Sequence, residues 1–145
     1  MPEMTADEIK DFMAMFFPQA RMPIEIEDLR TGFLRIRVGI TERYLRPGGT
    51  VSGPALMTIA DTAMYYLLLA AIGPVPLALT TSLNIHFLRA PKPADLIAEA
   101  EILKLGQRLA VGEVTIYSVG SDEAVAHATV TYSIPPNVTG SAKPA

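Results

Sequence analysis

Hydrophobic positions recur with two different spacings along this chain and divide it into helical and extended segments. After Thr5, two acidic residues are followed by apolar side chains that recur every three or four positions up to Pro18. With Thr5 as N-cap, this pattern predicts an amphipathic helix over about 5–17. The apolar run TVSGPALMTIADTAMYYLLLAA at 50–71 lies between a Gly-rich loop and a Gly/Pro break, and it predicts a longer helix over about 54–72.

Six other segments alternate or run apolar over strand-like lengths and are bounded by turn residues. They predict β-strands at 24–28, 33–40, 78–89, 95–105, 109–119 and 123–133. In the last segment, the small side chains of Ala124, Ala126 and Ala128 share a face with Val130. This face would let the long helix pack closely against the strand.

The strand expected at 78–89 has one polar face. Alternation in LTTSLNIHFL predicts one side with Leu83, Ile85 and Phe87 and the other with Thr80, Ser82, Asn84 and His86. The polar side is a candidate border of a functional site, although a hydrogen-bonded structural role is the simpler interpretation of His86.

The order of the predicted elements indicates the fold class. A helix, two strands, a long helix and four strands predict an α+β domain with one antiparallel sheet curved around a long helix that is apolar nearly all round. We expect a single domain over 1–135 and a loose tail over 136–145. Because such a sheet leaves unpaired edges, a second copy of the chain could pair with it, and a homodimer is expected.

Composition argues against several classes of function and indicates a cellular location. The 145 residues carry a net charge of −3 and no Lys/Arg-rich block, which argues against a nucleic-acid partner. With no cysteine and only two histidines, a thiolate nucleophile is excluded and a metal site has little support. The N-terminus has acidic residues where a secretory signal needs basic ones, so we expect a cytoplasmic protein. A membrane span is disfavoured because Asp61 interrupts the long apolar run.

Asp61 is an ionisable group inside this apolar helix. Burying an unpaired carboxylate costs several kcal/mol or forces protonation, so it needs partners or a function. It could be a structural group held by hydroxyls or a perturbed catalytic group. The residues alone favour neither interpretation.

The start of the long helix also has chemical potential. Ser52 can serve as N-cap, and Pro54 suits the first helical position. Free backbone N–H groups and the positive end of the helix dipole would then lie near Gly53, where the lack of a side chain lets a ligand approach. This is a plausible place to polarise a carbonyl oxygen.

Three runs together resemble a known family. GGTVSGPALMTIADTAMYYLLLAAIG, TTSLNIHFLRAP and AEAEILKLGQRLAVGEVTIYS cover most of 48–133 and are similar to the hotdog-fold acyl-CoA thioesterases of the phenylacetate-pathway (PaaI-like) type. The family pattern is H-G-G-x-x-x-x-L-x-D-x-A. The resemblance implies a hotdog fold, a homodimer or a dimer of dimers with active sites between subunits, and hydrolysis of acyl-CoA with no cofactor besides the coenzyme A of the substrate.

The resemblance also implies roles for individual residues. Asp61 matches the catalytic aspartate, which acts as general base or nucleophile, and Gly53 matches the glycine whose N–H holds the thioester oxygen. Thr80 matches a hydroxyl that positions water. Further substrate contacts are expected from four other residues, Ser52 and Pro54 at the helix start, Asn84 on the polar strand face, and Arg108, whose guanidinium could meet coenzyme A phosphates.

The chain departs from the family pattern at three positions. Ser52 stands where the family has His, Pro54 where it has the second Gly, and Arg46 where Asn is common. Ser52 is more plausible as an N-cap than as a nucleophile, since no His is near it in sequence to activate it. The missing His keeps open a non-catalytic module that binds acyl thioesters. A hydratase on the same fold is weaker, because no His follows Asp61 before position 86.

Overall fold

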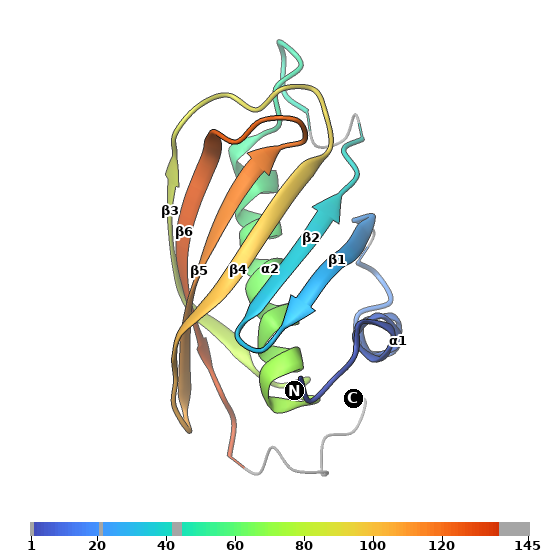
Figure 1. Ribbon diagram of the computed structural model, residues 1–145, viewed down its shortest axis with the longest axis vertical. Helices are drawn as coiled ribbons and strands as arrows, with labels where there is room; N and C mark the ends of the chain where they lie inside the picture. Colours follow the sequence, from blue (N-terminus) through green and yellow to red (C-terminus); the bar gives the residue numbers. More distant parts are fainter. Residues whose placement is uncertain (1, 21, 42–44, 137–145) are drawn as a thin grey trace.

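A single antiparallel sheet of six strands curves around one long helix (Figure 1). This computed structural model describes residues 2–20, 22–41 and 45–136. The elements in chain order are α1 (Ala6–Phe16), β1 (Ile24–Arg30), β2 (Phe33–Val38), α2 (Gly53–Ile72), β3 (Leu79–Phe87), β4 (Leu96–Leu105), β5 (Leu109–Ser118) and β6 (Ala124–Ser133). The strand order is β1-β2-β4-β5-β6-β3. The predicted α+β class is confirmed, whereas the predicted tail lies, apart from Pro136, outside the described residues.

Helix α1 begins at the predicted cap. The Thr5 hydroxyl accepts from the Glu8 N–H at 3.2 Å, and the Glu8 carboxylate accepts from the Thr5 N–H at 2.9 Å. This reciprocal capping box satisfies two helix-end donors. Ile9 and Phe12 are buried, and the Phe12 ring lies 6.3 Å from the Tyr65 ring of α2. The apolar stripe of α1 therefore packs toward α2.

Helix α2 starts one residue earlier than predicted. The Ser52 hydroxyl accepts from the Ala55 N–H at 3.3 Å, which confirms Ser52 as N-cap. Because Gly53 is the first helical residue, Pro54 occupies the second position rather than the first. Proline is tolerated there because the first N–H groups of a helix have no intrahelical acceptor. The helix ends at Gly73, whose φ of 90° lies in a region that favours glycine.

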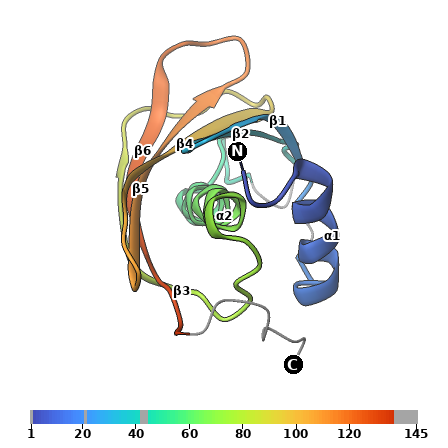
Figure 2. The ribbon, with the colours of Figure 1, turned by 60° about the horizontal axis from the view of Figure 1, so that its bottom comes forward.

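The sheet encloses most of α2, as the view along the helix shows (Figure 2). By length and composition this helix could cross a membrane, yet 67% of its most apolar window is buried inside the fold. It is a core helix. One long side remains outside the curve of the sheet, between α1 and β3 (Figure 2).

Small side chains on the inner face of β6 meet the core as predicted. Ala126, Ala128 and Val130 are fully buried. Ala124 was expected on the same face, and this expectation is wrong. The register between β5 and β6 shifts next to it, where Tyr117 pairs with Ala124. A bulge of one residue turns the following side chain to the opposite face.

Candidate functional site

Thr80 leaves the polar face of β3 and joins the inner face of the sheet. Leu83 pairs with the buried Val130, and Thr80 pairs with the buried Tyr132, but the register shifts by one residue between Thr80 and Ser82. Residues that pair directly share a face, and one extra residue reverses the alternation. The prediction that Thr80 shares a face with Ser82, Asn84 and His86 is therefore wrong for Thr80. The bulge turns its hydroxyl toward α2.

Asp61 receives two hydrogen bonds on one carboxylate oxygen. The Thr80 hydroxyl donates to Asp61 Oδ1 at 2.6 Å, and the Tyr132 hydroxyl donates to the same atom at 2.9 Å. The Tyr132 oxygen also lies 3.3 Å from the Asp61 backbone oxygen. Asp61 is therefore a partnered carboxylate, as the structural interpretation required. It is also half-exposed, which leaves it open to a ligand.

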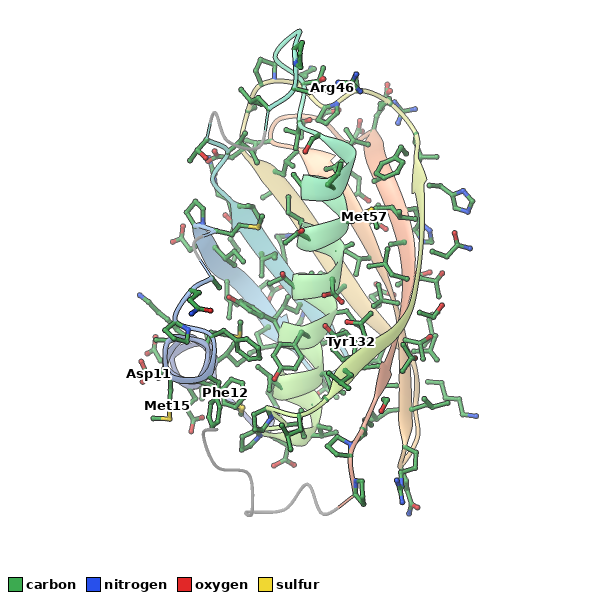
Figure 3. The ribbon with its side chains drawn as sticks, turned by 180° about the vertical axis from the view of Figure 1, so that it is seen from behind. Asp11, Phe12, Met15, Arg46, Met57 and Tyr132 are labelled. Atoms are coloured by element: carbon green, nitrogen blue, oxygen red, sulfur yellow. The ribbon has the colours of Figure 1, made fainter. Side chains whose placement is uncertain are left out.

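Tyr132 was missed by the sequence analysis. It is 4% exposed (Figure 3). Its ring stacks on that of Tyr65, with centroids 5.5 Å apart and planes inclined by 20°. The Tyr65 hydroxyl in turn donates to the Val75 backbone oxygen at 2.9 Å. Burial, and to a smaller extent the negative charge of Asp61, raises the pKa of Tyr132 above its ordinary value, so the phenol stays protonated and donates. Because Tyr132 lies 71 residues from Asp61, only the strand register could have revealed the contact.

A cavity of about 290 Å³ opens beside Asp61 on the uncovered side of α2. Its lining includes Met13, Phe17 and Ala20 from the N-terminal segment, with Thr62, Tyr65 and Leu79 opposite. Asp61 is the only charged residue among the described residues that line it. No residue that the structure describes donates to the other Asp61 oxygen, Oδ2, and such an oxygen at the wall of a largely apolar cavity is suited to proton abstraction or nucleophilic attack.

A larger groove of about 680 Å³ adjoins this cavity between α1 and α2. The two share four lining residues, namely Met13, Phe17, Ala20 and Thr62. Ser52 and Pro54 line the groove, so two of the expected substrate contacts belong to a space that borders the Asp61 cavity.

Gly53 and Asp61 do not meet within one chain. They are eight residues apart on α2, which at 1.5 Å per residue separates them by about 12 Å along the helix axis. Gly53 instead lines a different cavity of about 410 Å³, together with Arg46, Phe87 and Arg89. One thioester carbonyl cannot reach the Gly53 N–H and the Asp61 carboxylate of the same chain.

Asn84 and Arg108 lie away from the Asp61 cavity. Asn84 pairs with the exposed Thr129 on the outer face of the sheet. Arg108 is exposed in the turn between β4 and β5, where its backbone oxygen accepts from the Ile134 N–H at 2.8 Å. Neither residue lines the Asp61 cavity or the adjoining groove. Their expected contacts with substrate stay predictions.

The two histidines also lie on the outer face. His86 pairs with His127, and His127 Nε2 lies 3.4 Å from a carboxylate oxygen of Glu113. Among the residues that the structure describes, no three His, Asp or Glu side chains are grouped as metal ligands would be.

Comparison with known proteins gives the sequence a family match. Residues 48–132 match the family described as the thioesterase superfamily. A Halobacterium salinarum protein named for an inferred esterase activity is 32% identical over 99 residues, which cover 64% of this chain and 64% of that protein. The chain thus spans less than two thirds of this curated relative's length.

Solved structures extend the likeness to nearly the whole chain. A Silicibacter protein named for an inferred thioesterase activity is 40% identical, with a TM-score of 0.84, over 94% of this chain and 95% of that one. The PaaI protein of the E. coli phenylacetic acid degradation operon is 23% identical, with a TM-score of 0.68, over 77% and 79% of the two chains. A Streptococcus mutans protein bound to acetyl-CoA is 18% identical, with a TM-score of 0.70, over 78% and 89%. The last two similarities concern the fold alone.

Proposed function

The chain belongs to the thioesterase superfamily and has the hotdog fold that the resemblance implied, and we propose that it hydrolyses an acyl-CoA or related thioester to a free acid and a thiol. One observation carries the proposal. Asp61 presents a carboxylate to a mostly apolar cavity, with one of its oxygens already held by two hydroxyl donors. Membership of the family explains why an apolar core helix would retain this charge.

The active site forms between two copies of the chain in this proposal. The axial separation of Gly53 and Asp61 supports it, since one carbonyl needs a donor and a base about 3 Å away. Strand β3 is an edge of the sheet, and Leu79 and Phe87 on it are 66% and 52% exposed. Such an edge is suited to pairing with a second copy. The partner's glycine at the helix start would then approach Asp61.

The chemistry is acyl transfer to water. The Gly53 N–H stabilises the negative charge on the thioester oxygen, aided by the helix dipole. In the general-base route, a water oxygen bonds to the carbonyl carbon, its proton passes to Asp61, and the C–S bond breaks to release a thiolate. In the nucleophilic route, an Asp61 oxygen bonds to the carbonyl carbon and the C–S bond breaks to release the thiolate, after which water cleaves the resulting anhydride to regenerate Asp61 and give the free acid. Because Thr80 donates its one hydroxyl proton to Asp61, it orients water only as an acceptor.

The acyl group occupies the groove between α1 and α2 in this proposal, and coenzyme A extends toward solvent. The largely apolar lining of the groove and its shared wall with the Asp61 cavity support this arrangement. Bound acetyl-CoA in the Streptococcus mutans relative supports coenzyme A as the carrier. Ser52 and Pro54 border the acyl group. Asn84 and Arg108 contact coenzyme A in this proposal. Because both lie away from the Asp61 cavity of their own chain, these contacts require the second chain of a dimer.

A binding module without turnover is the alternative. The motif histidine is absent, and Ser52 uses its hydroxyl oxygen as the helix cap rather than as a nucleophile. This alternative predicts acyl-CoA affinity without thiol release.

A thiol-release assay over acyl-CoA chain lengths and aryl-acyl-CoAs separates the two. Because the chain has no cysteine, a thiol reagent detects only product. We expect release by the wild type, and a loss of roughly 10²-fold or more in Asp61→Asn and Asp61→Ala. Affinity without release from any substrate would support the binding module. Equal release by all three proteins would remove Asp61 from the mechanism.

A further inference from the structure

Both hydrogen bonds to the Asp61 side chain end on the same oxygen. Each carboxylate oxygen has two lone-pair directions, and the hydroxyls of Thr80 and Tyr132 occupy those of Oδ1. Oδ2 accepts no hydrogen bond from the residues that the structure describes. The two oxygens of this carboxylate are therefore not equivalent, and only Oδ2 is left for a ligand in the cavity.

We infer that Tyr132 is a positioning residue that, with Thr80, fixes the Asp61 carboxylate so that Oδ2 is the oxygen that reacts. The inference rests on the proposed function. Tyr132 does not itself touch substrate in this role. Its hydroxyl proton is given to Oδ1, so it is not the acid that protonates the leaving thiolate.

Tyr132 is better fixed than Thr80, and this is why we assign the role to it. Thr80 is exposed and lies beside a bulge on an edge strand. Tyr132 lies on β6 between β5 and β3, its ring stacks on Tyr65, and Tyr65 is tied to the Val75 backbone. A second contact to the Asp61 backbone oxygen holds the phenol against the same residue at two points. The buried Tyr132 phenol therefore keeps its position relative to Asp61 even when the exposed Thr80 hydroxyl rotates.

The charges around the cavity show which groups interact with the Asp61 carboxylate. Among the described residues that line the cavity there is no Lys, Arg or His, so the hydroxyls of Thr80 and Tyr132 are the groups that hold the Asp61 carboxylate there. Burial raises the pKa of Tyr132, which keeps the phenol a donor across the neutral pH range. Removing that one donor should free the Asp61 carboxylate to rotate, because only the Thr80 hydroxyl would still hold Oδ1.

Tyr132→Phe is the decisive variant, because phenylalanine keeps the ring and its stack and removes only the hydroxyl. We expect kcat to fall about 10- to 100-fold, the effect of losing one hydrogen bond to a charged group. KM should change by less than about 2-fold, since the cavity wall is unaltered. The matched control is Tyr117→Phe, which removes a half-exposed phenol on the outer face of β5, and it should behave as wild type.

Two further measurements separate positioning from a structural role. In the Asp61→Asn background, adding Tyr132→Phe should lower the remaining rate by less than about 2-fold, because residues that act as a unit are not additive. Carbon-13 NMR of the labelled aspartates follows the Asp61 carboxylate without turnover, and its chemical shift at neutral pH should differ between Tyr132→Phe and wild type.

Failure of the inference and failure of the proposed function give different results. A wild type that releases no thiol contradicts the function, and the NMR comparison of the Asp61 carboxylate then still decides the role of Tyr132. An active wild type with an equally active Tyr132→Phe and an unchanged NMR signal of the Asp61 carboxylate overturns the inference. Equal losses in both Asp61 backgrounds, together with a lowered Tm, would reduce Tyr132 to a structural residue.

Discussion

Thr80 and Tyr132 lie opposite each other on neighbouring antiparallel strands, and their hydroxyls converge on one oxygen of Asp61. The relationship depends on register, since a shift of one residue would turn the Thr80 side chain to the other face. It joins an edge strand, an inner strand and the core helix at one carboxylate.

Gly53→Ala should fold and lose activity. A Cβ at position 53 would meet the Phe87 ring at 3.4 Å or more, which is ordinary contact, so Tm should change by only a few degrees. The added methyl group would keep a thioester oxygen away from the backbone N–H. We expect kcat to fall roughly 10²- to 10³-fold, as when an oxyanion donor is lost. Thermal unfolding and thiol release on one sample check this. A fully active variant would show that the Gly53 N–H is not the donor.

Ala14→Phe should shorten the range of acyl chains. Ala14 is exposed and lines the groove between α1 and α2, so a phenylalanine there would occupy the proposed acyl space. Each methylene that can no longer be buried loses about 0.8 kcal/mol, so two displaced methylenes lower kcat/KM by roughly 10-fold. We expect this loss with long-chain acyl-CoA and little change with acetyl-CoA.

The matched control is Met15→Phe, because Met15 is 63% exposed on the outer side of α1 and does not line the groove (Figure 3). Assays over chain length compare the two variants. Identical profiles would locate the acyl group elsewhere.

Stability should decline at alkaline pH because of the buried tyrosines. Burial raises the pKa of Tyr132 above its ordinary value of 10.0, and it acts in the same direction on Tyr65 and Tyr66. The unfolded chain therefore loses these protons first, so the stabilisation is present below about pH 10 and is lost as pH rises further. One tyrosine accounts for up to about 1.4 kcal/mol per pH unit.

Tyr132→Phe should make this decline shallower. Urea unfolding at about pH 9 and about pH 11 measures the free energy of unfolding in each protein. Tyr117→Phe serves as the comparison, since Tyr117 is on the outer face of the sheet. If the free energy of unfolding fell by the same amount between these two pH values in wild type and Tyr132→Phe, the Tyr132 phenol would not keep its proton in the folded protein.

Much of the fold was predictable from local pattern. The helix caps at Thr5 and Ser52 depend on contacts within three residues, so the local sequence predicted them. The six strands were predicted from the alternation of apolar and polar residues. The eight-residue spacing of Gly53 and Asp61 was also visible, and it already implies separation along a helix.

The hydrogen bonds of the site were not predictable in the same way. Thr80 and Thr81 are identical side chains, and the position of a bulge decides which of them faces α2. The bulge reverses the alternation that the prediction used, which is why Thr80 was placed on the wrong face. Tyr132 comes from a distant strand, and its contact with Asp61 follows from sheet order and register, which no local pattern contains.

The bulge on β3 also places a second threonine, Thr81, next to the hydroxyl donor Thr80. If it moved one residue toward the start of the strand, Thr81 would pair with Tyr132 and bring an equivalent hydroxyl to the carboxylate. A substitution that removes the Thr80 hydroxyl would thus be compensated by its neighbour, whereas on β6 the residues that flank Tyr132 are Thr131 and Ser133, and neither has the reach of a phenol. Mutational robustness in this site is concentrated on one of its two donors.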